Sequence, residues 1–587
     1  MLRATYAGFT TALSALQANQ KRLDVTGHNL ANMTTEGYTR QELSVTSLNY
    51  DHPSSFYMNE NDVNVGFGVS IDGVRQARDP FLDTQFRMQN AIKNYNQITR
   101  EALSSLEGFL DESHINGLHA AFNNVQTALT TMQDPSKVND PVYEGQLRSR
   151  MKEVTVLLNE ASIRIDAAVK NEYQRLDGTE SNKQGAEQKV NELLKDIGNM
   201  NCIIKRSQIL GDPSLELTDQ RNALIDKLSE FLPIEVSYYK DPEHEGEKAW
   251  PDDLKIELVY ENADSALNRL TLVDGTKGGN VGNTGKNCGS IKIDADGKTN
   301  RIPESGGINY QKVFDTKLVV TEAGDKPESA RSIICGSKIS DGSNTTENEE
   351  TVRLSGGSIQ AGIDMLSRDR YGTIRNFYEY KENLDNLART FAKTMNEINR
   401  VGTRYTTDVD DDNLKKHIEN RPYALFEGRN LEGKFDEFTG TEKLTEENEK
   451  LYNEITAGNI VISEGWKSDK VHIGTRGESS TDSVLNMLNA MEEPQKGLEN
   501  MRFVSYANFL STQLASDASV TDYKLETDTN IMNAIQRSKD EISGISLDEE
   551  AAHMLEYTSA YNAAARLMTA LDEVLNTLIN GTGIVGR

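Results

Sequence analysis

Residues 554–578 read MLEYTSAYNAAARLMTALDEVLNTL, and alternating steps of three and four residues along this stretch always reach an apolar side chain. A repeat that averages 3.5 residues places these side chains in one narrow stripe along an α-helix, which is the seam of a left-handed coiled coil. The eight residues of this C-terminal seam are Met554, Tyr557, Tyr561, Ala564, Met568, Leu571, Leu575 and Leu578. The stripe predicts a long helix that packs against another helix.

The opposite end of the chain carries a stripe with the same repeat. Its apolar members form the N-terminal seam, and they are Leu2, Tyr6, Phe9, Leu13, Leu16, Leu23 and Leu30. Two other positions of the repeat hold Gln20 and Gly27. We expect the two terminal helices to pair as a coiled coil and to form the surface that joins this protein to other subunits.

Composition limits the possible partners. The 587 residues are enough for roughly three or four domains. With 63 basic against 91 acidic residues, the formal net charge is −28, which argues against nucleic acid and anionic membranes as partners. The sequence has no apolar run of membrane-spanning length, and Thr5, Thr10 and Thr11 interrupt any apolar segment of a secretory signal. We expect a cytosolic protein, or one exported without cleavage of its N-terminus.

The pattern between the seams predicts a multi-domain α+β protein. Helical periodicity runs from Asp79 to about Leu228, and it returns at Ile359–Ile398, Val484–Met491 and from about Met501 to Ile542. Short strand-like runs lie between the first two helical regions. They are Ile234–Tyr239, Leu254–Tyr260, Leu270–Val273, Ile291–Ile293, Lys317–Val320 and Ser332–Cys335.

These patterns predict four domains, each with its own composition. A terminal coiled-coil domain comprises residues 1–50 with 546–587, and a mainly helical core domain comprises 51–233 with 352–400 and 484–545. A β-rich outer domain is inserted at 234–351, and an acidic second insertion follows at 401–483.

Turn signals mark the inner ends of the terminal helices. The segment Asn32–Tyr38 is rich in Asn, Thr and Gly and predicts a turn. Alternating apolar residues beyond it predict a strand over 63–71 that ends at Asp72-Gly73. Ser546 with Glu549 three residues later predicts a capping box at the start of the last helix.

The search for catalytic chemistry identifies no site. In His244-Glu245-Gly246-Glu247-Lys248 a lysine replaces the second histidine of a zinc-protease motif. The series Asp408, Asp410, Asp412 and Glu419 resembles a calcium loop but lacks its glycine. Three scattered cysteines, Cys202, Cys288 and Cys335, suggest neither a disulfide framework nor a metal cluster. We expect a protein that is not an enzyme and has no cofactor or metal.

The inner ends of the terminal helices carry a resemblance. The run Asn29-Leu30-Ala31-Asn32-x-x-Thr35-x-Gly37-Tyr38-x-Arg40 resembles the N-terminal signature of bacterial flagellar axial proteins, the rod, hook and junction proteins. Ser543-Gly544-Ile545-Ser546-Leu547-Asp548-Glu549-Glu550, followed by Tyr557 and Tyr561, is similar to the C-terminus of the members that join hook to filament. Leu217-x-Asp219-Gln220-Arg221 also resembles their inner helical domain. Glu36 departs from the pattern, because this family usually has proline there.

The resemblance implies a structural subunit of the flagellum. Such a subunit would self-assemble into a ring through its terminal helices, between the hook protein and a second junction protein. It would be exported by the flagellar type III apparatus to the cell exterior, with a chaperone bound to the C-terminal helix before export. One alternative is another axial protein, of the hook or distal rod. Another is a junction protein whose outer insertion has adhesin or hydrolase activity.

Overall fold

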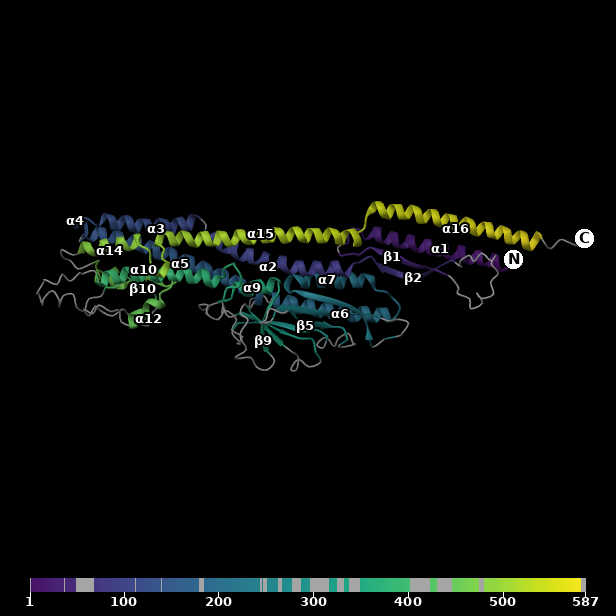
Figure 1. The fold of residues 1–587 in the computed structure, drawn as a ribbon, viewed down its shortest axis with the longest axis horizontal. Helices are drawn as coiled ribbons and strands as arrows, with labels where there is room; N and C mark the ends of the chain where they lie inside the picture. Colours follow the sequence, from purple (N-terminus) through teal and green to yellow (C-terminus); the bar gives the residue numbers. More distant parts are fainter. Residues whose placement is uncertain are drawn as a thin grey trace, which may run out of the picture.

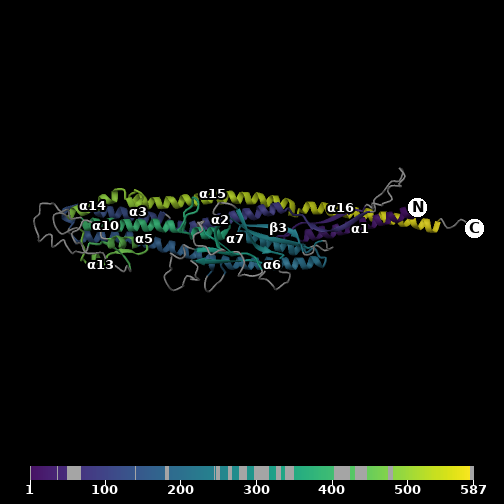
Figure 2. The ribbon, with the colours of Figure 1, turned by 60° about the horizontal axis from the view of Figure 1, so that its bottom comes forward.

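The computed structural model describes most of the chain as one elongated molecule (Figure 1). The described residues are 2–35, 37–48, 68–110, 112–138, 140–178, 184–242, 245, 251–261, 267–276, 287–295, 316–324, 332–336, 349–401, 423–429, 446–473 and 480–581. The first and last helices lie side by side at one end, and the remaining helices and a β-sheet form the rest of the body (Figures 1 and 2). The protein is therefore a mainly helical core with β insertions.

Helices provide most of the described structure. They are α1 (Leu2–Ala31), α2 (Pro80–Leu110), α3 (Glu112–Thr131), α4 (Pro135–Val138), α5 (Pro141–Asp177), α6 (Ala186–Ile209), α7 (Leu215–Phe231), α9 (Ser358–Met365), α10 (Phe377–Val401), α12 (Glu446–Glu454), α13 (Glu464–Lys467), α14 (Ser480–Glu492), the short 3-10 helix η3 (Lys496–Leu498), α15 (Phe503–Ser543) and α16 (Leu547–Gly581). In the part of the chain that the structure describes, no helix is both long and apolar enough to cross a bilayer.

The helical region expected over Ile359–Ile398 consists of two helices, α9 and α10, separated by a non-helical connection. The segment between α9 and α10 contains Gly372, whose φ of +75° is a left-handed conformation that a continuous α-helix excludes. Leu366 and Ile374 fit the helical spacing of apolar residues in the sequence, but both lie in the non-helical connection.

The strands form one large sheet and two short antiparallel pairs. They are β1 (Gln41–Ser47), β2 (Val69–Gln76), β3 (Ile234–Lys240), β4 (Asp252–Glu261), β5 (Leu267–Asp274), β6 (Ser290–Ala295), β7 (Thr316–Thr321), β8 (Ser332–Cys335), β9 (Glu349–Leu354), β10 (Phe426–Gly428) and β11 (Ile460–Ile462). The seven-stranded sheet has the order β3-β4-β9-β8-β7-β6, with β5 also paired to β4. Only the β8–β9 pair of this sheet is parallel.

One predicted strand needs correction, and some strands of the structure were not predicted. The strand expected to end at Asp72-Gly73 continues as β2 to Gln76, because Gly73 adopts a φ of +151° opposite an irregularity in β1 and the pairing then resumes. The positions 63, 65 and 67 of that prediction lie outside the described residues. Strand β9 was missed because its polar start, Glu349-Glu350-Thr351, resembles a loop. Strands β10 and β11, which have only three residues each, were missed in the acidic insertion.

Aromatic side chains join distant parts of the chain at the end of the body opposite α1. Phe391 of α10 lies 5.3 Å from Phe122 of α3 and 5.5 Å from Phe503 of α15, measured between ring centroids. Phe426 of β10 lies 5.1 Å from Phe391. All four rings are fully buried. Aromatic pairs at these distances contribute about 1 kcal/mol each beyond the burial of their area, so this cluster fixes the helices and β10 together.

A buried carboxylate attaches the sheet to the helices. Asp364 of α9 accepts hydrogen bonds from Tyr95 of α2 at 2.7 Å, Gln360 at 2.7 Å and Arg353 of β9 at 2.9 Å. Three donors around one carboxylate compensate the loss of its hydration. The sheet therefore has a fixed position on the helical core.

A second carboxyl group in the core gives stability a dependence on pH. Asp385 of α10 accepts a hydrogen bond from the Ala457 backbone at 2.8 Å, and burial raises the pKa of its carboxyl group to about 6. Because the pKa in the folded state exceeds that of the unfolded chain, folding favours the protonated form. Stability is then lost as the pH rises from about 4 through 6.

We predict that Asp385→Asn removes this loss. The free energy of unfolding of the variant should exceed that of the wild type by about 1–2 kcal/mol at pH 7 and by much less at pH 4. Urea unfolding at both pH values measures the difference. Glu449→Gln, at an exposed site on α12, is the control. An equal effect of Asp385→Asn at both pH values would contradict the prediction.

Candidate functional site: the junction of the terminal helices

The first and last helices of the chain, α1 and α16, pack against each other in opposite directions (Figures 1 and 2). Three contacts define their alignment. A Cβ atom on Gly8 would lie 3.3 Å from Leu571, the Arg22 guanidinium lies 5.3 Å from the centre of the Tyr557 ring, and Asn29 donates to Glu550 at 3.1 Å. Steps of 14 and then 7 residues forward on α1 match equal steps backward on α16. Multiples of seven keep one side of each helix in contact.

The side of α1 that faces α16 carries small residues. Ala12 and Thr26, which are 1% and 3% exposed, lie in the same 3.5-residue repeat as Gly8, Arg22 and Asn29. Small side chains allow two helix backbones to approach closely. Each position of this stripe lies one residue before a position of the predicted seam repeat, which corresponds to a rotation of about 100° around the helix.

A second side of α1 is covered by β1 and β2. Ser14 accepts a hydrogen bond from the Val69 backbone at 3.2 Å, and Ala18 is 3% exposed. A Cβ atom on Gly68 would lie only 2.1 Å from Ser14 Oγ, so only glycine permits this approach. The hairpin therefore packs closely on α1.

The predicted N-terminal seam lies on the remaining side of α1. Leu13 is 46% exposed, and the other members with described side chains are partly exposed: Phe9, Leu16, Leu23 and Leu30. The side chains of Leu2 and Tyr6 lie outside the described residues. Within a single chain these leucines are thus incompletely covered, and their role in assembly stays a prediction.

The predicted C-terminal seam is the side of α16 that faces α1. Tyr557 and Leu571 make the contacts given above, and Ala564 is 8% exposed. The other members are partly buried, and they are Met554, Tyr561, Met568, Leu575 and Leu578. By contrast, apolar residues outside the seam are exposed, such as Leu555 at 73% and Ile579 at 65%.

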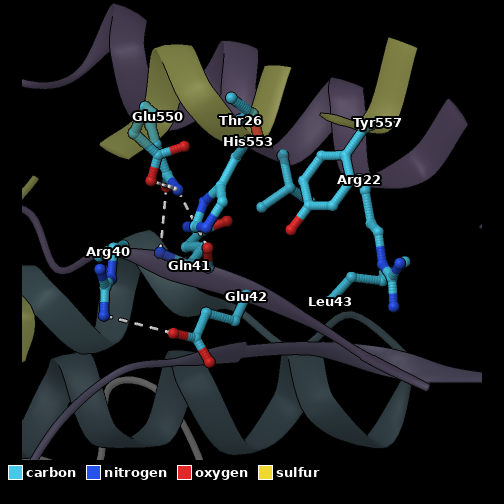
Figure 3. Close-up of a pocket in the computed structure, with 11 residues that line it drawn as sticks. Arg22, Thr26, Arg40, Gln41, Glu42, Leu43, Glu550, His553 and Tyr557 are labelled. Atoms are coloured by element: carbon cyan, nitrogen blue, oxygen red, sulfur yellow. Dashed lines mark hydrogen bonds and ion pairs between the residues drawn. The ribbon is translucent and has the colours of Figure 1, made fainter. Parts of the chain in front are cut away.

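Asn29 joins three segments with one side chain. Its amide nitrogen donates to the Gln41 carbonyl at 3.0 Å and to the Glu550 carboxylate at 3.1 Å. Its amide oxygen accepts from the Tyr38 hydroxyl and the Gln41 backbone, both at 3.0 Å. A primary amide has two donor hydrogens and two acceptor lone pairs, so this set uses all four. We call Asn29, Tyr38, Gln41 and Glu550 the terminal junction, and Figure 3 labels two of its members, Gln41 and Glu550.

The other residues of the family turn shape the connection from α1 to β1. Asn32 donates to the His28 carbonyl at 3.0 Å and accepts from the Thr35 hydroxyl at 3.2 Å, which closes the end of the helix. Gly37 has a φ of +77°, a conformation that glycine adopts without a steric penalty. Tyr38 then points back to Asn29. Glu36, the departure from the family pattern, lies outside the described residues.

Arg40 and Thr39 fix the terminal helices to the body. The Arg40 backbone donates to the Ser543 carbonyl at 2.9 Å, and its side chain lies 3.2 Å from Glu549 of α16. Thr39 donates twice to Asp219 of α7, from its backbone at 3.0 Å and from its hydroxyl at 2.7 Å. The turn is thus held by α7, α15 and α16 together.

The capping box at α16 is present in part. Glu549 donates its backbone amide to Ser546 Oγ at a long distance of 3.5 Å, as an N-cap requires, but its carboxylate pairs with Arg40. The acidic side chain therefore links two segments in addition to its place in the first turn of the helix, where negative charge is favourable.

Burial sets the charge state of the junction. It raises the pKa of the Tyr38 hydroxyl well above its usual range, and the carboxylates of Glu216, Asp219 and Glu550 add to the effect. Tyr38 therefore remains a hydrogen-bond donor. Burial also raises the pKa of Asp219, although the two hydrogen bonds from Thr39 oppose the change.

A cavity of about 180 Å³ lies beside the junction, between α1, β1 and α16 (Figure 3). Its lining includes Arg22, Arg40, Glu42 and His553 together with Asn29, Gln41 and Glu550 of the junction. Among the described residues, no group of three or more histidine, cysteine or acidic side chains is placed to hold a metal. The arrangement serves to bind chain segments together.

The sequence did not reveal the residues with which the turn forms hydrogen bonds: Gln41, Glu550 and Asp219. Gln41 follows the quoted turn directly, and neither Glu550 nor Asp219 was assigned a hydrogen-bond role from the sequence. Their hydrogen-bond roles depend on pairing across about 180 and 520 residues, which a single sequence does not reveal.

Three family models match this chain. The model described as "Flagellar hook-associated protein FlgK helical domain" matches residues 103–302. "Flagella basal body rod protein" matches residues 9–39, and "Flagellar basal body rod FlgEFG protein C-terminal" matches residues 536–581. The flagellar hook-associated protein 1 of Bacillus subtilis (strain 168) is 28% identical over 591 residues, which cover 100% of both chains. The chain belongs to the flagellar hook-associated protein 1 family.

Other members of this family are more distant. The flagellar hook-associated protein 1 of Escherichia coli (strain K12) is 22% identical, with 97% of this chain and 98% of that protein covered. A solved structure, "The structure of the flagellar hook junction protein FlgK from Burkholderia pseudomallei", matches 78% of this chain and 100% of that chain at 10% identity and a TM-score of 0.47. The two rod-protein models cover most of the N-terminal seam and the whole C-terminal seam.

We predict that Asn29→Ala loosens the terminal junction in this family member. The change removes four hydrogen bonds and leaves buried partners without them, which costs about 3 kcal/mol locally. Amide hydrogen exchange in β1 and in the first turns of α16 should accelerate by about 100-fold, while the Phe391 cluster stays protected. Gln20→Ala, at an exposed site of α1, is the control. Unchanged exchange in Asn29→Ala would show that the amide is not the main link.

Proposed function

We propose that this protein forms the junction between the flagellar hook and filament, by self-assembly through its terminal helices. It is a structural component of the bacterial flagellum, as its family membership indicates. The observation that carries the proposal is the partly exposed leucine stripe on α1, beside the helix that pairs with it. Relatives named hook-associated proteins support the position in the flagellum.

The surface of the terminal helix pair favours further packing. On α1, Leu13 is 46% exposed, and on α16, Leu555, Leu567 and Val574 are 73%, 49% and 54% exposed. Two paired helices bury only the sides that face each other, so each retains apolar residues elsewhere. Exposed apolar side chains gathered on one structural element are typical of interaction sites. Neighbouring subunits in a ring would cover them.

We infer that the pair of α1 and α16 is an antiparallel coiled coil. The contacts at Gly8, Arg22 and Asn29 recur at multiples of seven residues, as knobs-into-holes packing requires. Residues 1–50 with 546–587 would form this assembly domain, and the helical core, the 234–351 insertion and the 401–483 insertion would lie outside it. The C-terminal seam then contributes to assembly by pairing α16 with α1, and the N-terminal seam is left for contacts between subunits.

The partners follow from the position at the junction. The hook protein would contact one side of the ring and the second junction protein the other. A chaperone that covers α16 before export by the type III apparatus would hide its exposed leucines until assembly outside the cell. The function proposed is structural, without an enzymatic activity.

Deletion of the gene tests the proposal. We predict cells that keep their hooks but lack filaments, with filament protein released into the medium, because filament subunits would have no junction to join. Electron microscopy of the cell surface and analysis of the medium give the result. A plasmid copy of the gene should restore filaments. Normal filaments in the deletion strain would refute the proposal.

Leu13→Glu tests the exposed side of α1. The substituted residue is already 46% exposed, so the monomer should keep its fold, whereas a carboxylate inside a subunit interface would be buried without a partner. We predict that complementation with this variant gives few or no filaments. Leu210→Glu, at a site that is 83% exposed beyond α6, should restore them fully. Equal complementation by both variants would place the assembly surface elsewhere.

A further inference from the structure

Helix α6 lies along the start of strand β6 in a fixed alignment. Glu187 accepts from the Ile293 backbone at 2.7 Å, Asn191 exchanges two hydrogen bonds with the Ile291 backbone at 2.8 and 2.9 Å, and Asn287 donates to the Gly198 carbonyl at 3.4 Å. Residue numbers increase along α6 while they decrease along the adjacent strand segment, so the two elements run in opposite directions. Eleven residues of helix and six of strand span about 17 and 20 Å, so the two elements stay side by side.

Two cysteines lie where this alignment ends. Asn287 also donates to the Cys202 sulfur, one helical turn beyond Gly198, at 3.6 Å. Cys288 is the next residue after Asn287, and its thiol interacts electrostatically with Lys195 and Cys202, two α6 positions that are seven residues apart. Both cysteines are partly buried and present as thiols.

The backbone at Cys288 is held in place by β5. Cys288 forms an isolated antiparallel bridge with Val273, the Gly289 backbone donates to Leu272 at 2.7 Å, and Asp274 donates to Asn287 at 2.9 Å. A Cβ atom on Gly289 would lie 2.2 Å from the Thr321 carbonyl, so the segment also fits tightly against β7. The backbone of Cys288 therefore has a fixed position next to Asn287, whose side chain contacts Cys202.

We propose that Cys202 and Cys288 are a disulfide site, oxidised after folding to link α6 covalently to the edge of the sheet. The location outside the cell, which belongs to the proposed function, is where disulfides persist. The oxidant is a small disulfide or an enzyme that carries one.

The disulfide forms by thiol–disulfide exchange with the oxidant. One cysteine loses its proton, and its thiolate attacks a sulfur of the oxidant, which releases the first thiolate of the oxidant and forms a mixed disulfide. The second cysteine, also deprotonated, attacks the protein sulfur of that mixed disulfide and releases the second thiolate. The two released thiolates take up the two protons. The protein loses two electrons, and the oxidant is reduced to two thiols.

The surroundings set the speed of this reaction. Burial raises the pKa of both thiols, although Lys205 opposes the shift at Cys202 and Lys195 opposes it at Cys288. The thiolate is the nucleophile, so oxidation should be slow at pH 7 and faster at pH 9. Cys335, which is fully buried in β8, lies away from any oxidant and serves as the internal control.

The test uses the purified full-length chain with oxidised glutathione. Titration of thiols in denaturant should fall from three per chain to one, and peptide mapping should find residues 202 and 288 cross-linked, faster at pH 9 than at pH 7. The melting temperature should rise by several degrees, because the bridge closes the long segment 203–287.

Matched variants identify the pair. Cys335→Ser should keep both the cross-link and the rise in melting temperature, whereas Cys202→Ser and Cys288→Ser should lose both. Three thiols retained at pH 9, a stable mixed disulfide with glutathione, or cross-links between chains would each overturn the proposal. None of these results affects the role in the flagellum, which the gene deletion tests separately.

Discussion

The amide of Asn29 is the interaction on which the arrangement of the chain ends depends. It is 2% exposed, and its four hydrogen bonds reach β1, the turn after α1 and the start of α16. No other uncharged side chain of this size offers two donors on one atom and two lone pairs on another. Aspartate would lack the donors and would add a negative charge next to Glu550. The pairing of α1 with α16, the start of β1 and the contact with α7 each involve Asn29 or residues of the turn that follows it.

Beyond Asn29, the size of the side chains on α1 determines how closely the neighbouring elements approach it. Gly8, Ala12 and Gly68 lie where another backbone or side chain approaches α1 closely, and larger residues would separate the elements. The leucines of α1 with described side chains lie one position along the helix from the stripe of small residues and are partly exposed. Tight intramolecular packing and an apolar external surface thus come from the same helix, through stripes that differ by one residue.

The sequence was informative where periodicity is strong and uninterrupted. The terminal helices, the long helices of the core and six strands of the large sheet follow from apolar spacing alone. Spacing was not sufficient at Gly372, where a left-handed residue divides α9 from α10, or at β9 and β10, which are short or begin with charged residues. Of the residues that connect the terminal helices to each other and to the body, the sequence identified only those in the turn. The turn residues are contiguous, but Asp219 and Glu550 reach them from distant parts of the chain, and one sequence carries no record of such pairing.

The pairing of the first helix with the last has a consequence for quality control. Chains are made from the N-terminus onward, so α1 exists long before its partner, and α16 follows every other helix in sequence. A chain cut short by premature termination or proteolysis keeps the amide of Asn29 but has no Glu550 to receive it. Such a fragment would present an unmatched α1 and could not reproduce the two-helix end of the intact subunit. Only a chain whose translation is complete can therefore form the two-helix end that the structure shows.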